Sequence, residues 1–233
     1  MSDSNKPWPP IDVELPSYGP PASSSSASTS GSTPPAPAIA RCNFMTIERP
    51  HKKIEGAFVI DPNLPVLEEQ LPRMSTEEQE AGRRANLRLF SKHDYIKVDV
   101  WILDWPNTIA NEKQPMSSWL HFDATHDGGD IRIHSLGNAP CKISVVTTHA
   151  TTDVQLPNDY TGLLTFHRKH GSVSGLLPER VTTISDIGGT LKCFIGDAAL
   201  LSAPWTGHSL DVRATHGKLK LQFGTKPRNL TPP

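Results

Sequence analysis

Apolar and polar residues alternate along much of the chain after residue 42, and a period of two is typical of β-strands that bury one face. The alternation recurs in six segments, each arranged symmetrically about one histidine. Around His149, for example, Val145 on one side corresponds to Val154 on the other. The six segments supply 24 such positions, of which 22 are apolar and two are glycine, although only 36% of the chain is hydrophobic. We therefore predict an all-β domain of repeated strand–turn–strand units that share one core.

The histidines at the centres of the units are His51, His93, His126, His149, His170 and His216. Two architectures fit the repeat. The arms of each unit can pair with each other as a hairpin in a sandwich, or each unit can be one coil of a β-solenoid whose arms pair with neighbouring coils. From His93 onward the spacings are 33, 23, 21 and 46 residues. Because 46 is twice 23, we expect a degenerate unit without a histidine over Gly189–Leu201.

One helix is expected in the long connection after the first unit. Ser75 and Glu78 have the spacing of a capping box, in which each residue satisfies a backbone N–H group of the other. The pattern predicts that a helix opens in the sequence TEEQEAGRRA, at residues 76–85.

The first forty residues contain nine prolines and ten serines. Such a segment buries too little apolar surface to offset its chain entropy, so we predict a disordered tail over residues 1–40. The all-β repeat domain is expected over residues 42–225, followed by a C-terminal tail at 226–233. Proline-rich segments are docking sites for proteins, and a protein partner that binds the tail is the one partner the sequence suggests.

The column of turn histidines has two interpretations. Tight turns favour residues that tolerate a positive φ, and histidine is enriched among them. Alternatively, a row of imidazoles along one rim binds a transition metal or senses protons. Stacked coils would place the rings about 4.8 Å apart, close enough to share a metal, whereas hairpin tips would lie too far apart. The candidate ligands are His93, His126, His149, His170 and His216.

Composition excludes several classes of protein. The net charge of −1 and the pI near 6.8 argue against binding to nucleic acid or anionic lipid. No apolar segment approaches the ~20 residues of a membrane helix, and the N-terminus lacks the apolar region of a signal peptide. The three cysteines are expected to be reduced thiols, so we predict a cytoplasmic or nuclear protein.

No catalytic or cofactor motif stands in the sequence. Gly171–Gly175 resembles a nucleophile elbow, but Val173 occupies the central position where that motif has serine. We therefore expect no catalytic residue, no cofactor and no enzymatic activity. Trp101, Trp105 and Trp119 lie close along the sequence, and core packing is their expected use, with a sugar-stacking platform as the alternative.

Several motifs together resemble a known family. They are an Ile-x-Gly-x-aromatic-x-Ile-Asp-Pro stretch at 54–62, Asn86-Leu87-x-Leu89, Asp99-Val100-Trp101 and the closing run 215–221, after a Pro/Ser-rich start. This combination resembles a domain family of mushroom-forming fungi, domain of unknown function 7330, and more distantly the adhesin-like β-repeat domains of bacteria. The resemblance implies stacked β-repeats and supplies no activity and no site residues.

The sequence thus predicts a non-enzymatic scaffold or binding module whose partner it does not identify. The alternative is a metal- or pH-responsive protein that uses the rim of turn histidines.

Overall fold

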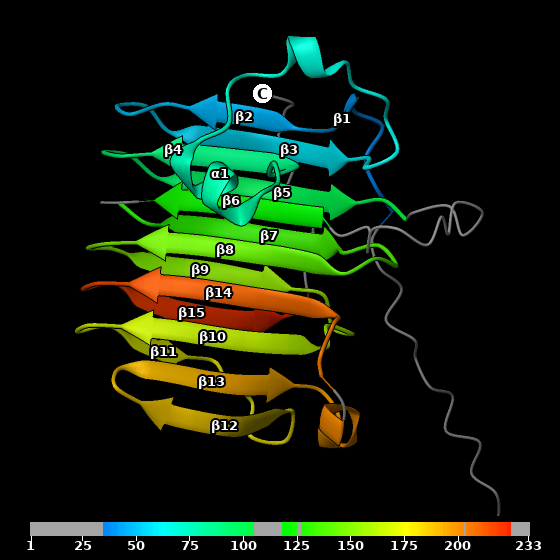
Figure 1. Cartoon of the computed structure of the whole chain (residues 1–233). Coiled ribbons are helices and arrows are strands. Elements are labelled where there is room, and N and C mark those ends of the chain that lie inside the picture. Colours follow the sequence, from blue (N-terminus) through cyan, green and yellow to red (C-terminus); the bar gives the residue numbers. More distant parts are fainter. Residues whose placement is uncertain (1–34, 105–117, 125–126, 203, 225–233) are drawn as a thin grey trace, which may run out of the picture. The chain divides into compact units, whose positions relative to one another are not determined.

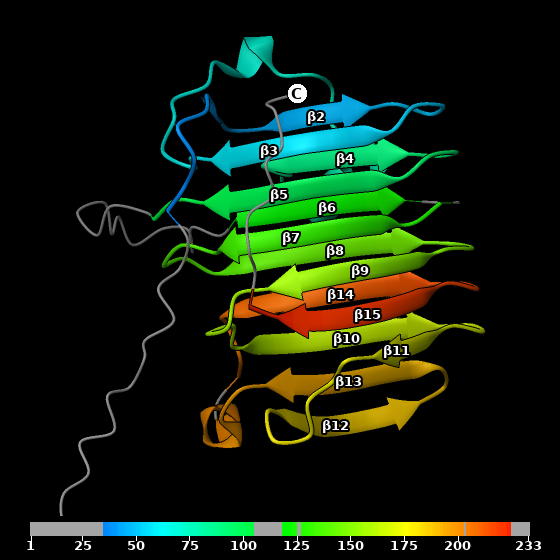
Figure 2. The same ribbon diagram turned by 180° about the vertical axis from the view of Figure 1, so that it is seen from behind.

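The structure is a computed structural model that describes residues 35–104, 118–124, 127–202 and 204–224. The predicted tails therefore lie outside the described residues, except for residues 35–40. Within the described ranges, strands dominate and form two sheets that face each other across one apolar core (Figures 1 and 2). The predicted all-β class is confirmed.

The first sheet contains, in spatial order, β1 (Arg41–Cys42), β3 (Ile54–Ile60), β5 (Ile96–Ile102), β7 (Gly129–Ser135), β9 (Thr151–Leu156), β15 (Lys218–Phe223) and β11 (Ser172–Ser174). The second sheet contains β12 (Val181–Ile187), β13 (Thr190–Ile195), β10 (Gly162–Arg168), β14 (His208–Ala214), β8 (Cys141–Thr147), β6 (Ser118–Ala124), β4 (Leu87–Ser91) and β2 (Met45–Glu48). Two short 3-10 helices, η1 (Glu68–Gln70) and η3 (Ala198–Ser202), lie in connections.

Strands pair between units and not within them. The arms β8 and β9 of the unit around His149 lie in different sheets. Each arm pairs in parallel with an arm of the preceding unit, β8 with β6 and β9 with β7. Parallel neighbours of this kind are the mark of stacked coils, so the solenoid-like alternative is correct and the hairpin alternative is wrong.

The coils do not stack in the order of the sequence. The last unit inserts between two earlier ones, because β14 lies between β8 and β10, and β15 lies between β9 and β11. Figure 1 shows the same insertion as the red and orange strands between the yellow-green ones. The last unit, around His216, therefore lies between the fourth coil, around His149, and the fifth, around His170, and pairs with both.

The predicted degenerate coil over 189–201 is wrong. Its strand β13 pairs antiparallel with β10 and with β12. The reason is the two-residue turn Gly188-Gly189, in which both glycines have positive φ values of 61° and 78°. Such a turn reverses the chain into a hairpin, so the two flanking strands pair with each other and do not form separate sides of a coil. Its predicted apolar positions nevertheless face the core: Leu191 is 8% exposed and Cys193 is fully buried.

The predicted inward positions form the core. Val145, Val154 and Val212, for example, are fully buried. The clear exception is Leu177, which is 39% exposed although the symmetry about His170 predicted it to face inward. A positive φ of 82° at Gly175 turns the chain out of the strand after β11, and this ends the second arm early.

The predicted capping box opens helix α1 (Thr76–Ala81). The Glu78 carboxylate accepts from the Ser75 N–H at 2.8 Å, and the Ser75 hydroxyl accepts from the Glu78 N–H at 3.3 Å. Gly82 ends the helix with a φ of 64°, four residues before the end of the predicted stretch. Figure 1 shows α1 in front of the second sheet near β4 and β6. No helix among the described residues has the length and apolarity to cross a membrane.

Candidate functional site

The turn histidines form a ladder of stacked rings at one end of the strands. The rings of His51 and His93 lie 4.9 Å apart between centroids, with 8° between their planes. The His216 ring is stacked on both sides, 5.3 Å from His149 and 5.0 Å from His170. We call these five residues the histidine ladder. The structure thus brings together three of the five candidate ligands, His149, His170 and His216, while His93 stacks on His51 in a separate pair.

Backbone hydrogen bonds carry the sheet pairing into the turns. The His93 N–H donates to the Pro50 carbonyl oxygen at 2.9 Å, and the His216 N–H donates to the Thr148 carbonyl oxygen at 2.7 Å. In both cases the acceptor is the residue before the histidine of the neighbouring coil. The turns therefore keep the register of the strands, and equivalent side chains lie one above the other.

The expected reason for histidine in these turns is wrong. Among the described non-glycine residues, only Phe44 has a positive φ, so none of the five ladder histidines needs the left-handed backbone. His126, the remaining candidate ligand, lies outside the described residues. Ring stacking between coils accounts for the column instead, because it repeats only where the turns are in register.

The ladder geometry does not suit a metal shared by neighbouring rings. The lone pair of an imidazole nitrogen lies in the ring plane, and Zn–N bonds are about 2.1 Å long. Rings that are parallel within 10° and about 5 Å apart hold their lone pairs in separate, nearly parallel planes, which do not converge on one ion. The described residues also contain no group of three or more His, Cys, Asp or Glu placed to hold a metal.

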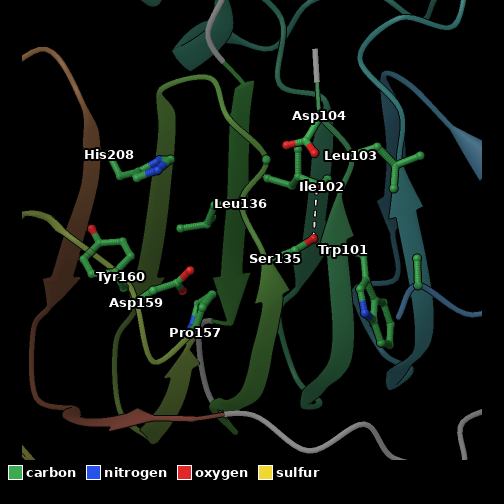
Figure 3. A pocket seen from close by; sticks show the side chains of 12 residues that line it. Trp101, Ile102, Leu103, Asp104, Ser135, Leu136, Pro157, Asp159, Tyr160 and His208 are labelled. Carbon is green, nitrogen blue, oxygen red and sulfur yellow. Dashed lines mark hydrogen bonds between the residues drawn. The ribbon is translucent and has the colours of Figure 1, made fainter. Parts of the chain in front are cut away.

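A groove lies at the opposite end of the strands, where one coil connects to the next. It has a volume of about 360 Å³ and crosses the ends of β5, β7 and β9 and the beginning of β14 (Figure 3). We call it the coil-end groove. Its lining residues are Ala36, Trp101, Ile102, Leu103, Asp104, Ser135, Leu136, Gly137, Pro157, Asp159, Tyr160 and His208.

Two polar side chains at one end of the groove are held by the fold. His208 Nδ1 accepts a hydrogen bond from the Cys141 N–H at 3.1 Å, which places the ring proton on Nε2. Burial lowers the pKa of His208, and the nearby Asp159 carboxylate opposes that shift. Tyr160 is 1% exposed, and its hydroxyl has no hydrogen-bond partner within the described part of the chain. Burial also raises the pKa of Tyr160.

The groove is acidic and has no activated nucleophile. Asp104 and Asp159 contribute carboxylates, and no Lys or Arg is among the described lining residues. The Ser135 hydroxyl donates to the Ile102 carbonyl oxygen at 2.9 Å, so its proton is already used. The described lining residues therefore contain no nucleophile–base pair.

A second buried polar cluster lies on the outer face of the first sheet. His134 Nε2 and Asp99 Oδ1 lie 2.7 Å apart, and both side chains are fully buried. The Trp101 ring stacks on the His134 ring at 4.3 Å, and Ile39 packs against the small apolar cluster to which Trp101 belongs. Because the pair is sealed from solvent, it serves the packing of this face. Asp99 and Trp101 stand at outward positions of their strand, so period two alone predicts them exposed.

The groove was not predicted from the sequence, because most of its lining residues lie in irregular connections that have no hydrophobic period. The tryptophans were predicted to serve in core packing, and Trp101 and Trp119 are 2% and 3% exposed as that requires. They lie in different sheets, and Trp105 is outside the described residues.

Comparison with known families supplies the identification. Residues 43–225 match the family described as Domain of unknown function (DUF7330). The chain belongs to this family. A comparison of the DUF7330 chain with curated proteins finds no match. Among solved structures, it is similar to a putative cell adhesion protein from Clostridium sporogenes, with 9% identity, a TM-score of 0.32, and coverage of 77% of this chain and 97% of that one. At that TM-score the similarity carries no argument about function.

Proposed function

We propose that this DUF7330 domain is a non-enzymatic binding module whose ligand site is the coil-end groove. The supporting observation is that four neighbouring coils together build one cavity of about 360 Å³ with polar and apolar walls. Cavities of this size are typical of small-ligand sites. Parallel pairing gives the groove a rigid frame, since β5, β7, β9 and β14, whose ends it crosses, each have parallel neighbours on both sides.

The absence of catalysis is part of the proposal. The hydroxyl of Ser135 and the Nδ1 atom of His208 are both engaged with the backbone, so neither is available as a nucleophile or base in this arrangement. The Asp99–His134 pair is the other arrangement with the appearance of a catalytic dyad, and its burial denies it a substrate.

A ligand screen by NMR tests the proposal. The full chain, labelled with ¹⁵N, is titrated with a panel of small amines, sugars and carboxylates. We expect the compounds that bind to shift the resonances of Tyr160, His208 and Asp104, with each compound recovered unchanged. Binding that maps elsewhere in the domain would contradict the assignment of the groove. Chemical conversion of a compound that depends on His208 would contradict the non-enzymatic role.

The alternative, a metal- or pH-responsive rim, has one observation in its favour, the stacking of imidazoles in one pair and in one group of three. The ladder geometry argues against a shared metal, which leaves protons. Two imidazolium charges 5 Å apart repel by about 0.8 kcal/mol in a water-like medium. The charged residues within two positions of the ladder histidines are mostly basic: Arg49, Lys52, Lys53, Lys92, Asp94, Arg168, Lys169 and Lys218. If this role is correct, the double variant His149→Asn/His216→Asn loses less stability than the wild type on acidification. Equal losses would exclude it.

Three further expectations belong to the same proposal. They are a protein partner docked on the Pro/Ser-rich residues 1–40, a cytoplasmic or nuclear compartment, and a fungal source. Pull-down with the full chain and with a variant in which the prolines of residues 1–21 are replaced by alanine tests the first. The proposal expects partner capture only by the unchanged chain, and equal capture would contradict it.

A further inference from the structure

We propose that the end of the stack bounded by β12 is a self-association surface, at which two copies of this chain meet around a two-fold axis. The surface consists of residues 175–188 and 196–201, which we call the β12 end. None of the described lining residues of the coil-end groove belongs to it, so self-association is independent of ligand binding in that groove. Three features support it: exposed apolar side chains, the unpaired edge of β12, and opposite charges at the two ends of that strand.

Exposed apolar side chains are concentrated at the β12 end. Five large hydrophobic side chains are exposed among the described residues, and four of them belong to this end: Leu177, Ile184, Ile187 and Leu200. Ile187 is 78% exposed and Leu200 is 51% exposed. Figure 1 shows that β12 and η3, which carry three of the four, lie at the same end of the stack. Scattered apolar residues on a surface are ordinary, whereas a group of them at one place marks a contact with another molecule.

β12 is also the longest strand at a sheet edge. The four edge strands of the two described sheets are β1, β2, β11 and β12, and they contain 2, 4, 3 and 7 residues. Proteins protect sheet edges by keeping them short or by placing Lys or Pro on them, and β12 has neither device. Its single charge is compensated, because Arg168 Nη2 donates to both carboxylate oxygens of Asp186, at 2.8 and 2.7 Å. Charge therefore does not keep a second molecule away from this edge.

A bulge in β12 determines which kind of partner fits. The register with β13 shifts between Thr183 and Ser185, which leaves Ile184 as the extra residue. An extended peptide that adds a strand needs an unbroken row of backbone N–H and C=O groups, and a bulge interrupts this row. The bulge does not hinder contacts between side chains, and Ile184 is 50% exposed. The edge thus suits a folded partner that packs apolar side chains against it.

The beginning of β12 is acidic. The Gly196 N–H donates to the Arg180 carbonyl oxygen at 2.9 Å, which brings Asp197 next to the residues that precede β12. Glu179 and Asp197 are both exposed, and neither forms an ion pair within the described part of the chain. The Arg180 guanidinium donates to the Tyr160 carbonyl oxygen at 3.2 Å. Two uncompensated carboxylates therefore lie at this end of the strand.

The other end of β12 is basic. The Arg168 N–H donates to the Gly189 carbonyl oxygen at 2.8 Å, so the exposed Lys169 lies beside the turn that ends β12. A two-fold axis perpendicular to β12 near Ile184 places the acidic beginning of one strand against the basic end of its copy. The same pairing occurs twice, once on each side of the axis. A second copy of the chain thus supplies the complementary charges as well as the apolar surface.

A closed dimer fits the stack better than a continuing filament, because the opposite end of the stack is covered. The connection after β3 crosses the first coil there (Figure 1), and the Asn43 side-chain amide donates to the carbonyl oxygens of Pro62 and Leu64 at 3.2 and 3.3 Å. The β12 end contains about 20 residues, and standard protein interfaces use roughly 20–30 residues on each side. Its size is therefore sufficient for a specific dimer.

Sedimentation equilibrium of the full chain tests the proposal. We expect a monomer–dimer equilibrium with a Kd of about 10 µM or tighter, the range of interfaces of this size. Ile184→Glu/Ile187→Glu should raise the Kd at least tenfold, because it places carboxylates in an apolar contact. Leu67→Glu, at a 65% exposed residue outside the β12 end, is the matched control and should leave the Kd unchanged. Urea unfolding shows whether both variants keep the fold, since each changes only exposed side chains.

A charge exchange tests the two-fold arrangement. Glu179→Lys and Lys169→Glu should each weaken the dimer about three- to tenfold, because each variant opposes like charges at two places. The double variant should return the Kd to within about threefold of the wild type. Failure of this rescue would overturn the two-fold arrangement. A monomer at every concentration up to about 200 µM, or a dimer that tolerates Ile184→Glu/Ile187→Glu, would overturn the self-association surface itself. Species larger than a dimer would also overturn it, because a two-fold contact closes.

Discussion

The stability of the domain should fall on acidification because of one buried histidine, His121. It lies on the outer face of the second sheet in β6, next to Trp119, and is 7% exposed. Burial lowers the pKa of His121 from 6.5 to about 4, Arg88 adds to the shift, and the nearby Glu77 opposes it. The α1 segment lies over the same face, where the Arg83 guanidinium is 5.5 Å from the Trp119 ring centre.

The size of the effect follows from linkage. The unfolded chain takes up a proton at this residue as the pH falls through about 6.5, whereas the folded chain takes it up only near pH 4. A depressed histidine pKa therefore stabilises the fold above pH 6.5, and this contribution is lost between pH 6.5 and 4. Each pKa unit corresponds to about 1.4 kcal/mol, so the full loss is about 3.5 kcal/mol. Between pH 7 and 4.5 we expect a loss of about 2.5 kcal/mol from this residue.

Urea unfolding of the wild type and of His121→Gln at pH 7 and 4.5 measures this contribution. The glutamine cannot titrate, so groups common to both proteins cancel in the comparison. The wild type should lose about 2.5 kcal/mol more than the variant over this range. A difference below about 0.5 kcal/mol would show that His121 is not held neutral by the docked α1 segment and would refute the reasoning.

Three further predictions concern the core, the ladder and the buried pair. Val145→Asp should cost more than about 4 kcal/mol because it buries an unpaired charge, whereas Lys218→Asp on the exposed face should stay within about 1 kcal/mol; similar losses in chemical denaturation would mean that the register is wrong. His216→Ala removes two ring contacts and His170→Ala one, so at about 0.5–1.5 kcal/mol per contact the first should cost about twice the second, and equal unfolding energies would argue against stacking. Asp99→Ala should cost about 3–5 kcal/mol, since it leaves the buried His134 without its partner, and a loss below about 1 kcal/mol by the same assay would contradict that role.

Much of the fold could be predicted because it rests on a local period. Alternation around His149 fixes which side chains face inward, and this holds whichever strand becomes the neighbour. The pairing partner is a different matter. Whether Val145 lies beside Val212 or beside Phe166 depends on which coil inserts where, and both are apolar residues at the same phase of their strands. The two-glycine turn at 188–189 was the local signal that could have revealed the antiparallel hairpin.

The candidate site, like the fold, could be predicted only where it depends on the local repeat. The histidine ladder was predictable as a column, because the repeat itself aligns its members. The reason for the column was not predictable, because a need for positive φ and ring stacking between coils would each place a histidine in every turn. The groove residues Asp104, Asp159 and His208 are brought together only by the order of the coils, and they share no spacing along the chain.

The stacking order is the central claim, because it brings His208 of the last coil to the groove residues that follow β5, β7 and β9. Disulfide formation between engineered cysteines measures it directly. In the structure Ser174 is the parallel neighbour of Lys220, and Lys220 is the neighbour of Asp153 on its other side. Neighbouring strands about 4.8 Å apart allow a disulfide, and a separation of two strands, about 9.6 Å, does not. After mild oxidation and peptide mapping by mass spectrometry, Ser174→Cys/Lys220→Cys should be crosslinked and Ser174→Cys/Asp153→Cys should remain reduced. The opposite result would mean that the coils stack in the order of the sequence.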